Sequence, residues 1–153
     1  MKLINLRLID EPLSIYIEAD AHTWDLHNAF ALKGVSQNLS ERSVSLLWQC
    51  SGYGELPLPV EGAEIVFAGV DYFEITPRDP AIPDFGEDSC LAGLSRVPSE
   101  VDTLTLIAQG GPLLNSESEE ELFHLWFAFR GGQCIRVGAE TATFRIKSGD
   151  RLI

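Results

Sequence analysis

The sequence contains no long apolar run, and this absence argues against a membrane-spanning protein. No stretch approaches the roughly 18 uncharged apolar residues of a membrane span. The first residues, MKLINLR, lack the uninterrupted apolar stretch of a signal peptide. We therefore expect a cytoplasmic protein without a membrane segment.

Cysteine and histidine are scarce, with three of each. Cys50, Cys90 and Cys134 are odd in number and form no Cys-x-x-Cys pair, which argues against a disulfide framework or a zinc ribbon. The histidines show no recognised zinc spacing. We expect buried thiols, no metal and no cofactor.

The usual catalytic signatures are missing as well. There is no Gly-x-Ser-x-Gly elbow, and no cysteine stands in a known catalytic context. Gly52-Tyr53-Gly54 and Gly131-Gly132 lack the lysine of a phosphate-binding loop, so turns explain them better. The sequence therefore favours a protein that is not an enzyme.

Basic residues are few, with 11 Lys and Arg against 23 Asp and Glu and a formal net charge of −12. Residues 55–121 hold fifteen acids and two bases, a net −13, whereas residues 1–54 carry −2 and residues 122–153 carry +3. This balance disfavours nucleic acid and anionic membranes, which need Lys and Arg contacts. It favours a basic protein partner, with plain solubility as the alternative explanation.

What is present is enough for one domain over residues 1–153. A chain of 153 residues with 45% hydrophobic residues can bury a core without disulfides or metals. Period-2 alternation dominates and predicts short strands. These strands are expected over residues 3–9, 13–19, 44–48, 65–76 with a bend at Gly69, and 101–107.

Two further features complete the predicted fold. Residues 123–130 and 133–137 form β-rich runs on either side of Gly131-Gly132, which predicts a hairpin that residues 141–147 extend into a meander. Ser118 and Glu121 have capping-box spacing, so a helix over 119–129 is a less favoured alternative. Short helices are possible over 23–30 and at an Asp88 cap. We predict a mainly β fold, an antiparallel β-sandwich or open barrel with one or two short helices.

Three tryptophans supply rings for this core. Trp48 and Trp126 lie within strand patterns and are assigned to the core, whereas Trp24 lies in a polar stretch and stays undecided.

Two acidic segments are the candidate binding surface. Residues 76–98 contain four prolines and are unusually long for a connection inside a compact domain. Residues 110–121 are acidic, and their composition is typical of a solvated linker. The candidate partner-binding residues are Asp79, Asp84, Glu87, Asp88, Glu117, Glu119, Glu120 and Glu121. Calcium at the first four is a minor alternative, because the EF-hand pattern is absent.

The order of several short segments resembles small β-rich bacterial proteins, including some immunity proteins that neutralise secreted toxins. The segments are 30–35 (FALKGV), 44–48, 67–70 (FAGV), 87–90 (EDSC) and 127–132 (FAFRGG). The resemblance implies stoichiometric binding of a partner and no catalytic residues.

The leading hypothesis is a non-enzymatic module that binds a basic protein, such as a toxin, through its acidic surface. The alternative is a ligand-binding or enzymatic β domain that uses the 76–98 loop and the region of Trp24, His22 and His27. The oligomeric state stays open, with a dimer possible. A further hypothesis is that folding brings Arg130, Arg136 and Arg145 against some of the acids.

Overall fold

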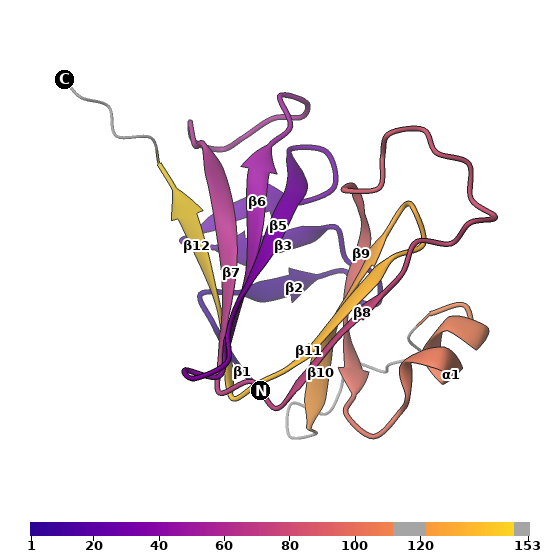
Figure 1. The fold of residues 1–153 in the computed structure, drawn as a ribbon. Coiled ribbons are helices and arrows are strands. Elements are labelled where there is room, and N and C mark those ends of the chain that lie inside the picture. Colours follow the sequence, from indigo (N-terminus) through magenta and orange to yellow (C-terminus); the bar gives the residue numbers. More distant parts are fainter. Residues whose placement is uncertain (112–121, 149–153) are drawn as a thin grey trace.

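The computed structural model describes residues 1–111 and 122–148, and this part of the chain is mainly β, with several antiparallel sheets and one short helix (Figure 1). Its largest sheet has five strands in the order β1-β12-β7-β6-β5. All neighbours in it are antiparallel except β1 and β12, which run parallel. The strands are β1 (Lys2–Ile4), β5 (Phe30–Asn38), β6 (Ser43–Cys50), β7 (Gly62–Ala68) and β12 (Thr141–Lys147).

Two smaller antiparallel sheets accompany it. The four-stranded sheet has the order β8-β11-β10-β9, and the three-stranded sheet has the order β2-β3-β4. Their strands are β2 (Arg7–Ile9), β3 (Tyr16–Ala19), β4 (His22–Asp25), β8 (Tyr72–Thr76), β9 (Leu91–Pro98), β10 (Phe123–Phe129) and β11 (Cys134–Gly138). The helix is α1 (Thr103–Ala108). No helix in the described residues has the length and apolar character needed to cross a membrane.

The main core lies between the five-stranded and four-stranded sheets. Trp48 of β6 packs against Phe127 and Phe129 of β10, with ring centroids 6.4 and 6.1 Å apart. Phe67 of β7 meets the edge of the Phe127 ring at 6.2 Å. Aromatic pairs of this geometry add to the burial of apolar surface, so these contacts fix how the two sheets face one another.

The other two tryptophans are buried in different clusters, Trp126 as predicted and Trp24, which the sequence left undecided, in the main core. Trp24 is 1% exposed and contacts Phe30 and Phe144, so it belongs to the main core. Trp126 is buried in a smaller cluster with Val97 and Leu106, on the opposite face of the four-stranded sheet beneath α1.

The hairpin around Gly131-Gly132 is confirmed, since β10 and β11 pair antiparallel from Leu125↔Val137 to Ala128↔Cys134. The meander is wrong. After β11 the chain crosses to the other sheet, and β12 pairs with β7 instead of β11. The amide of Glu140 donates to Ala68 O and Gly69 O across this crossing, which ties the two connections together.

The run 65–76 is two strands in two sheets. β7 ends at Ala68, Gly69 takes a positive φ of 66°, and β8 begins at Tyr72 in the four-stranded sheet. The predicted bend at Gly69 is therefore in the right place but redirects the chain between sheets. A Cβ at Gly69 would also lie 2.5 Å from the Glu140 side chain, so a larger residue does not fit.

Residues 101–107 are not a strand, because α1 begins at Thr103. Asp102 is its N-cap, and its carboxylate accepts hydrogen bonds from the Thr105 amide and hydroxyl at 2.8 and 2.7 Å. This capping outweighs the alternation of apolar residues and threonines that suggested a strand.

The N-terminal predictions are also too simple. Residues 3–9 divide into β1 and β2, which belong to different sheets, and residues 13–19 form a strand only from Tyr16. Residues 23–30 hold the end of β4 and a turn instead of a helix, and β9 starts where a helix capped by Asp88 was considered. Residues 123–129 are strand β10, as favoured over the helix alternative. Ser118 and Glu121 lie outside the described residues.

Candidate functional site

The candidate site is the loop between β8 and β9, residues 77–90, which extends from one end of the molecule (Figure 1). Arg78 ties the start of this 77–90 loop to its end. Its Nε donates to Asp88 Oδ2 at 2.7 Å, and its Nη1 donates to Ile82 O at 2.7 Å. Charged hydrogen bonds are stronger than neutral ones, so one arginine closes the loop at its base.

The turn of the β10–β11 hairpin supports the same loop. The Asp79 amide donates to Gly131 O at 3.0 Å, and the Arg130 amide donates to Cys90 O at 3.0 Å. Arg130 Nη1 also bonds to Glu87 Oε2 at 2.5 Å. Gly132, at φ +84°, lies so close that a Cβ there would be 2.7 Å from that of Asp79. The packing of loop on turn therefore requires glycine at this position.

The tip of the loop presents an aromatic ring to solvent. Asp84 Oδ1 accepts a hydrogen bond from the Gly86 amide at 2.8 Å, which fixes a tight turn around Phe85. Gly86 has a φ of +74°, a conformation that glycine adopts without strain. The Phe85 side chain is 78% exposed. The loop therefore holds a large apolar group out in water on an ordered backbone.

The four described candidate acids fall into two pairs. Glu87 and Asp88 are neutralised by Arg130 and Arg78, so folding does place an arginine against part of the acidic surface. Asp79 and Asp84 are exposed, and among residues 1–111 and 122–148 neither forms an ion pair. The other four candidates, Glu117, Glu119, Glu120 and Glu121, lie outside the described residues.

In the region of His22, Trp24 and His27, the tryptophan belongs to the core. The Trp24 indole is buried, and its Nε1 donates to Ala19 O at 3.2 Å. His22 meets the edge of the Trp24 ring, with centroids 6.0 Å apart. Trp24 is therefore not available as a stacking platform for a ligand.

His27 does reach the 76–98 region, where it meets Cys90. His27 Nδ1 lies 2.6 Å from Leu91 O and 3.4 Å from Cys90 Sγ. A carbonyl oxygen only accepts hydrogen bonds, so Nδ1 carries the proton and cannot take one from the thiol. Burial raises the pKa of Cys90, and Glu87 and Asp25 add to the rise against the opposing effect of Arg130. The pair therefore lacks the activated thiolate that a cysteine nucleophile needs.

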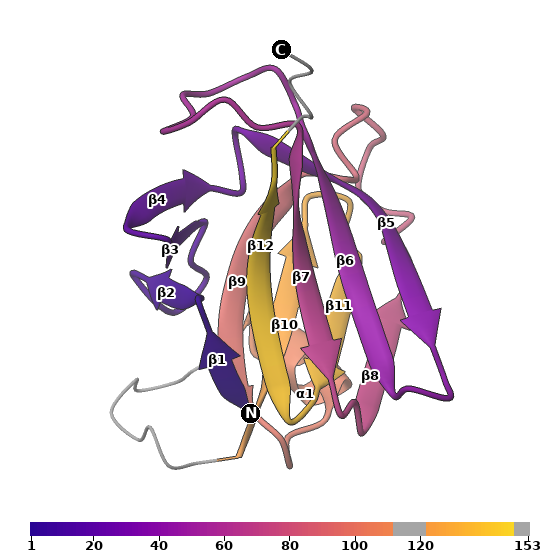
Figure 2. The same ribbon diagram turned by 90° about the vertical axis from the view of Figure 1, so that its left-hand side faces the viewer.

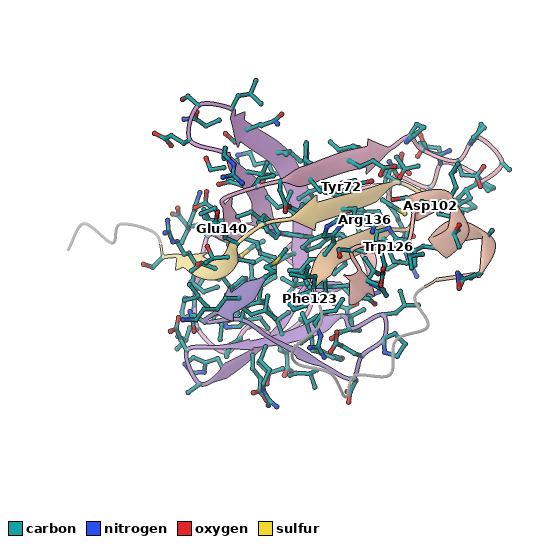
Figure 3. All side chains as sticks on the ribbon, turned by 90° about the horizontal axis from the view of Figure 1, so that it is seen from below. Tyr72, Asp102, Phe123, Trp126, Arg136 and Glu140 are labelled. Atoms are coloured by element: carbon teal, nitrogen blue, oxygen red, sulfur yellow. The ribbon has the colours of Figure 1, made fainter. Side chains whose placement is uncertain are left out.

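A second polar cluster, which sequence reasoning missed, surrounds Arg136 on β11 (Figure 3). Arg136 is 1% exposed. Its Nε donates to His124 Nδ1 at 3.0 Å, its Nη1 to Thr103 Oγ1 at 3.2 Å, and its Nη2 to Pro98 O at 3.0 Å. The Thr103 hydroxyl in turn donates to Glu74 Oε2 at 2.9 Å, so a carboxylate lies one hydrogen bond beyond the buried cation. The only sequence signal is an arginine inside the apolar run CIRVG.

The neighbours of Arg136 have shifted pKa values with clear causes. Burial lowers the pKa of His124, and the Arg136 charge lowers it further, against a smaller opposing effect of Asp71. Tyr72 stacks on His124 with centroids 4.7 Å apart and donates its hydroxyl to Glu74, and this hydrogen bond together with burial raises the pKa of Tyr72. All three nitrogens of the Arg136 guanidinium donate to described partners. We call Arg136 and these partners the Arg136 clasp, because the hydrogen bonds hold α1 and the end of β9 on the four-stranded sheet.

The described residues offer no assembled metal centre. Among them, no three His, Cys, Asp or Glu side chains are grouped so that they could hold a metal ion, and two of the acids proposed for calcium bind arginines instead. Comparison of the whole chain with protein-family models, with curated proteins and with solved structures finds no match.

Proposed function

We propose that this chain is a non-enzymatic binding module whose 77–90 loop docks on a basic protein. The observation that carries the proposal is Phe85, held 78% exposed on an ordered loop. Loops of this length in compact domains are usually functional, and exposed aromatic side chains are enriched among the residues that dominate binding energy. Because the loop is tied down before binding, little further ordering is needed when a partner arrives.

Charge supports a basic partner. The chain carries a net −12, and Asp84, next to Phe85 in sequence, and Asp79 of the same loop have no arginine partner among the described residues. Opposite charge on a partner would speed association and help to select it. The resemblance to immunity proteins implies that this partner is a toxin.

The scaffold behind the loop supports the same function. We infer an antiparallel β-sandwich rather than an open barrel, on the ground that Trp48 and Phe67 of one sheet meet Phe127 of the other. A rigid pair of sheets that carries a variable loop at one end is a common arrangement for recognition.

The test is capture of partners from native lysate at low and at high salt, with identification by mass spectrometry and titration of the purified partner. We expect a basic protein, bound more weakly at high salt. Phe85→Ala should weaken binding by about thirtyfold or more, the size of a hot-spot truncation. Asp79→Asn with Asp84→Asn should mainly slow association and flatten the salt dependence.

The matched control is Leu39→Ala with Glu41→Gln. Leu39 is 79% exposed, as Phe85 is, but it lies in the β5–β6 turn at the opposite end of the molecule in Figure 1. This control should bind like the wild type. The proposal is wrong if Phe85→Ala leaves affinity unchanged, if the control loses as much, or if the captured partner is acidic.

A further inference from the structure

The positive charge of this acidic chain is divided unevenly over its surface. In residues 1–111 and 122–148, five arginines pair with carboxylates and Arg136 is buried. The remaining cations are Arg145 and the chain's three lysines, Lys2, Lys33 and Lys147. Only Lys147 has an ion-pair partner among them, Glu64 at a long 3.8 Å.

These four cations share one surface, the outer face of the five-stranded sheet, which is turned away from the four-stranded sheet (Figure 2). Strand register shows this directly. Lys2 is opposite Thr141, and Arg145 is opposite Glu64, while the neighbouring residues Ala142 and Phe144 point into the core. The outer face therefore carries a positive surplus in a protein of net charge −12.

A hollow of about 590 Å³ lies over this face at the end where β6 meets β7. This volume falls in the range of small-molecule sites, about 300–1,000 Å³. Its lining includes Lys33, Leu47, Gln49, Glu61, Gly62 and Lys147.

The strands explain why the hollow exists. Gly62 is paired with Gln49 on one side and with Lys147 on the other. Because glycine has no side chain, it leaves open space between the Gln49 amide and the Lys147 ammonium group. A Cβ at Gly62 would lie 2.3 Å from Trp48 O, so a larger residue is excluded. Lys33 is the extra residue of a β-bulge between Leu32 and Gly34, a device that re-aims a side chain.

We propose that this hollow binds a small organic anion, a carboxylate or a phosphate monoester with an apolar body. Lys33 and Lys147 supply two ammonium groups, Gln49 supplies an amide, and Leu47 supplies apolar contact. The nearby carboxylates are Glu61 in the lining and Glu64, which is 3.8 Å from the Lys147 ammonium. Ammonium groups recognise such anions as point charges. The 77–90 loop reaches β5 next to Lys33, where the Leu32 amide donates to Ser89 O at 3.0 Å, and its acids Glu87 and Asp88 are bound by Arg130 and Arg78.

The test is a titration of the ¹⁵N-labelled protein followed by NMR, with phenyl phosphate and benzoate as probes and benzamide as their neutral counterpart. We expect saturable shifts with both anions at the backbone amides around Lys33, Gln49, Gly62 and Lys147, and far weaker shifts with benzamide. Lys33→Gln and Lys147→Gln should each weaken binding by about two- to fivefold, as expected for partly exposed charge contacts.

Two further variants separate this site from diffuse attraction. Lys2→Gln removes the same charge from the same face but lies away from the hollow, and it should leave the affinity unchanged. Glu61→Gln should strengthen binding, a gain that unfolding cannot imitate. The proposal fails if neither anion gives saturable shifts at millimolar concentration, if benzamide binds as well as the anions, or if Lys2→Gln weakens binding as much as Lys147→Gln.

Discussion

Arg136 Nε donates a hydrogen bond to His124 Nδ1 across 3.0 Å, and both side chains are buried. This contact requires His124 to be neutral, because a protonated imidazole has no acceptor and would place a second positive charge beside the guanidinium. The clasp that holds α1 is therefore coupled to pH.

The first prediction concerns the pH dependence of stability. The folded state holds the pKa of His124 below its ordinary value of 6.5, whereas the unfolded chain titrates near 6.5. Below that pH the unfolded chain binds the proton first, so the free energy of unfolding should fall as pH drops from 6.5 towards the folded pKa. Titration of His124 alone changes the free energy of unfolding by at most about 1.4 kcal/mol per pH unit. Urea denaturation between pH 7.5 and 5.5 measures it.

His124→Gln supplies the comparison for this prediction, because glutamine keeps an acceptor but does not titrate. The variant should lose less stability over the same pH interval, while the other titratable groups are common to both proteins. Parallel pH curves for the two proteins would show that His124 is not responsible.

The second prediction concerns the buried cation itself. Arg136→Met should cost about 2–4 kcal/mol, because it leaves His124 Nδ1 buried without its donor and removes the hydrogen bonds to Thr103 Oγ1 and Pro98 O. Arg136→Lys should not restore the loss, since an ammonium cannot reproduce the planar array of donors. Arg145→Met removes an exposed arginine and should change stability by less than about 0.5 kcal/mol. Denaturant unfolding measures the free energy of unfolding of the three variants. Equal losses for Arg136→Met and Arg145→Met would contradict a stabilising role for the Arg136 clasp.

The third prediction contrasts two glycines of the five-stranded sheet. Gly62→Ala should destabilise the protein by about 1–3 kcal/mol, because its Cβ would lie 2.3 Å from Trp48 O. Gly34→Ala meets no atom within 4 Å and should cause no loss. Thermal unfolding of the pair is the measurement, and a larger loss at Gly34 would mean that the strand packing described here is wrong.

The fourth prediction tests whether the 77–90 loop is held by Arg78. Chymotrypsin cleaves after phenylalanine, and Phe85 is exposed, yet an ordered loop resists a protease until it opens. Arg78→Met should speed cleavage after Phe85 by about tenfold, through local opening rather than global unfolding. Arg42→Met, which removes a long ion pair to Glu140, serves as the control. Rapid cleavage of the wild-type chain at Phe85 would argue against an ordered tip.

The sequence predicted those parts of the fold that depend on local chemistry. The Gly131-Gly132 hairpin follows from the turn residues between two β-rich runs, and the redirection at Gly69 follows from a glycine inside a strand pattern. The choice of sheet for each strand does not follow from such signals. The assignment of β12 to β7, instead of β11, depends on contacts between residues more than seventy positions apart.

The candidate site was predictable to the same extent. The 77–90 loop could be found from its prolines and acids, but the arginines that neutralise Glu87 and Asp88 could not, because Arg130 lies 43 residues from Glu87. The His27 and Cys90 contact joins positions 63 apart. Arg136 could not be recognised as a buried cation, since the carbonyl oxygens that bind it belong to Pro98, the last residue of β9, and to Ser99 after it.

The parallel pairing of β1 with β12 makes the first strand depend on the last. During synthesis on a ribosome, residues 2–4 emerge long before residues 141–143, their partners in the sheet. The nascent chain must therefore carry residues 2–4 unpaired until residues 141–143 have emerged. Pairings of such long sequence separation slow folding, and they leave strand edges open to other chains in the meantime. A cell that makes this protein has reason to protect the unpaired edge of β12's partner strands with chaperones until residues 141–143 have been made.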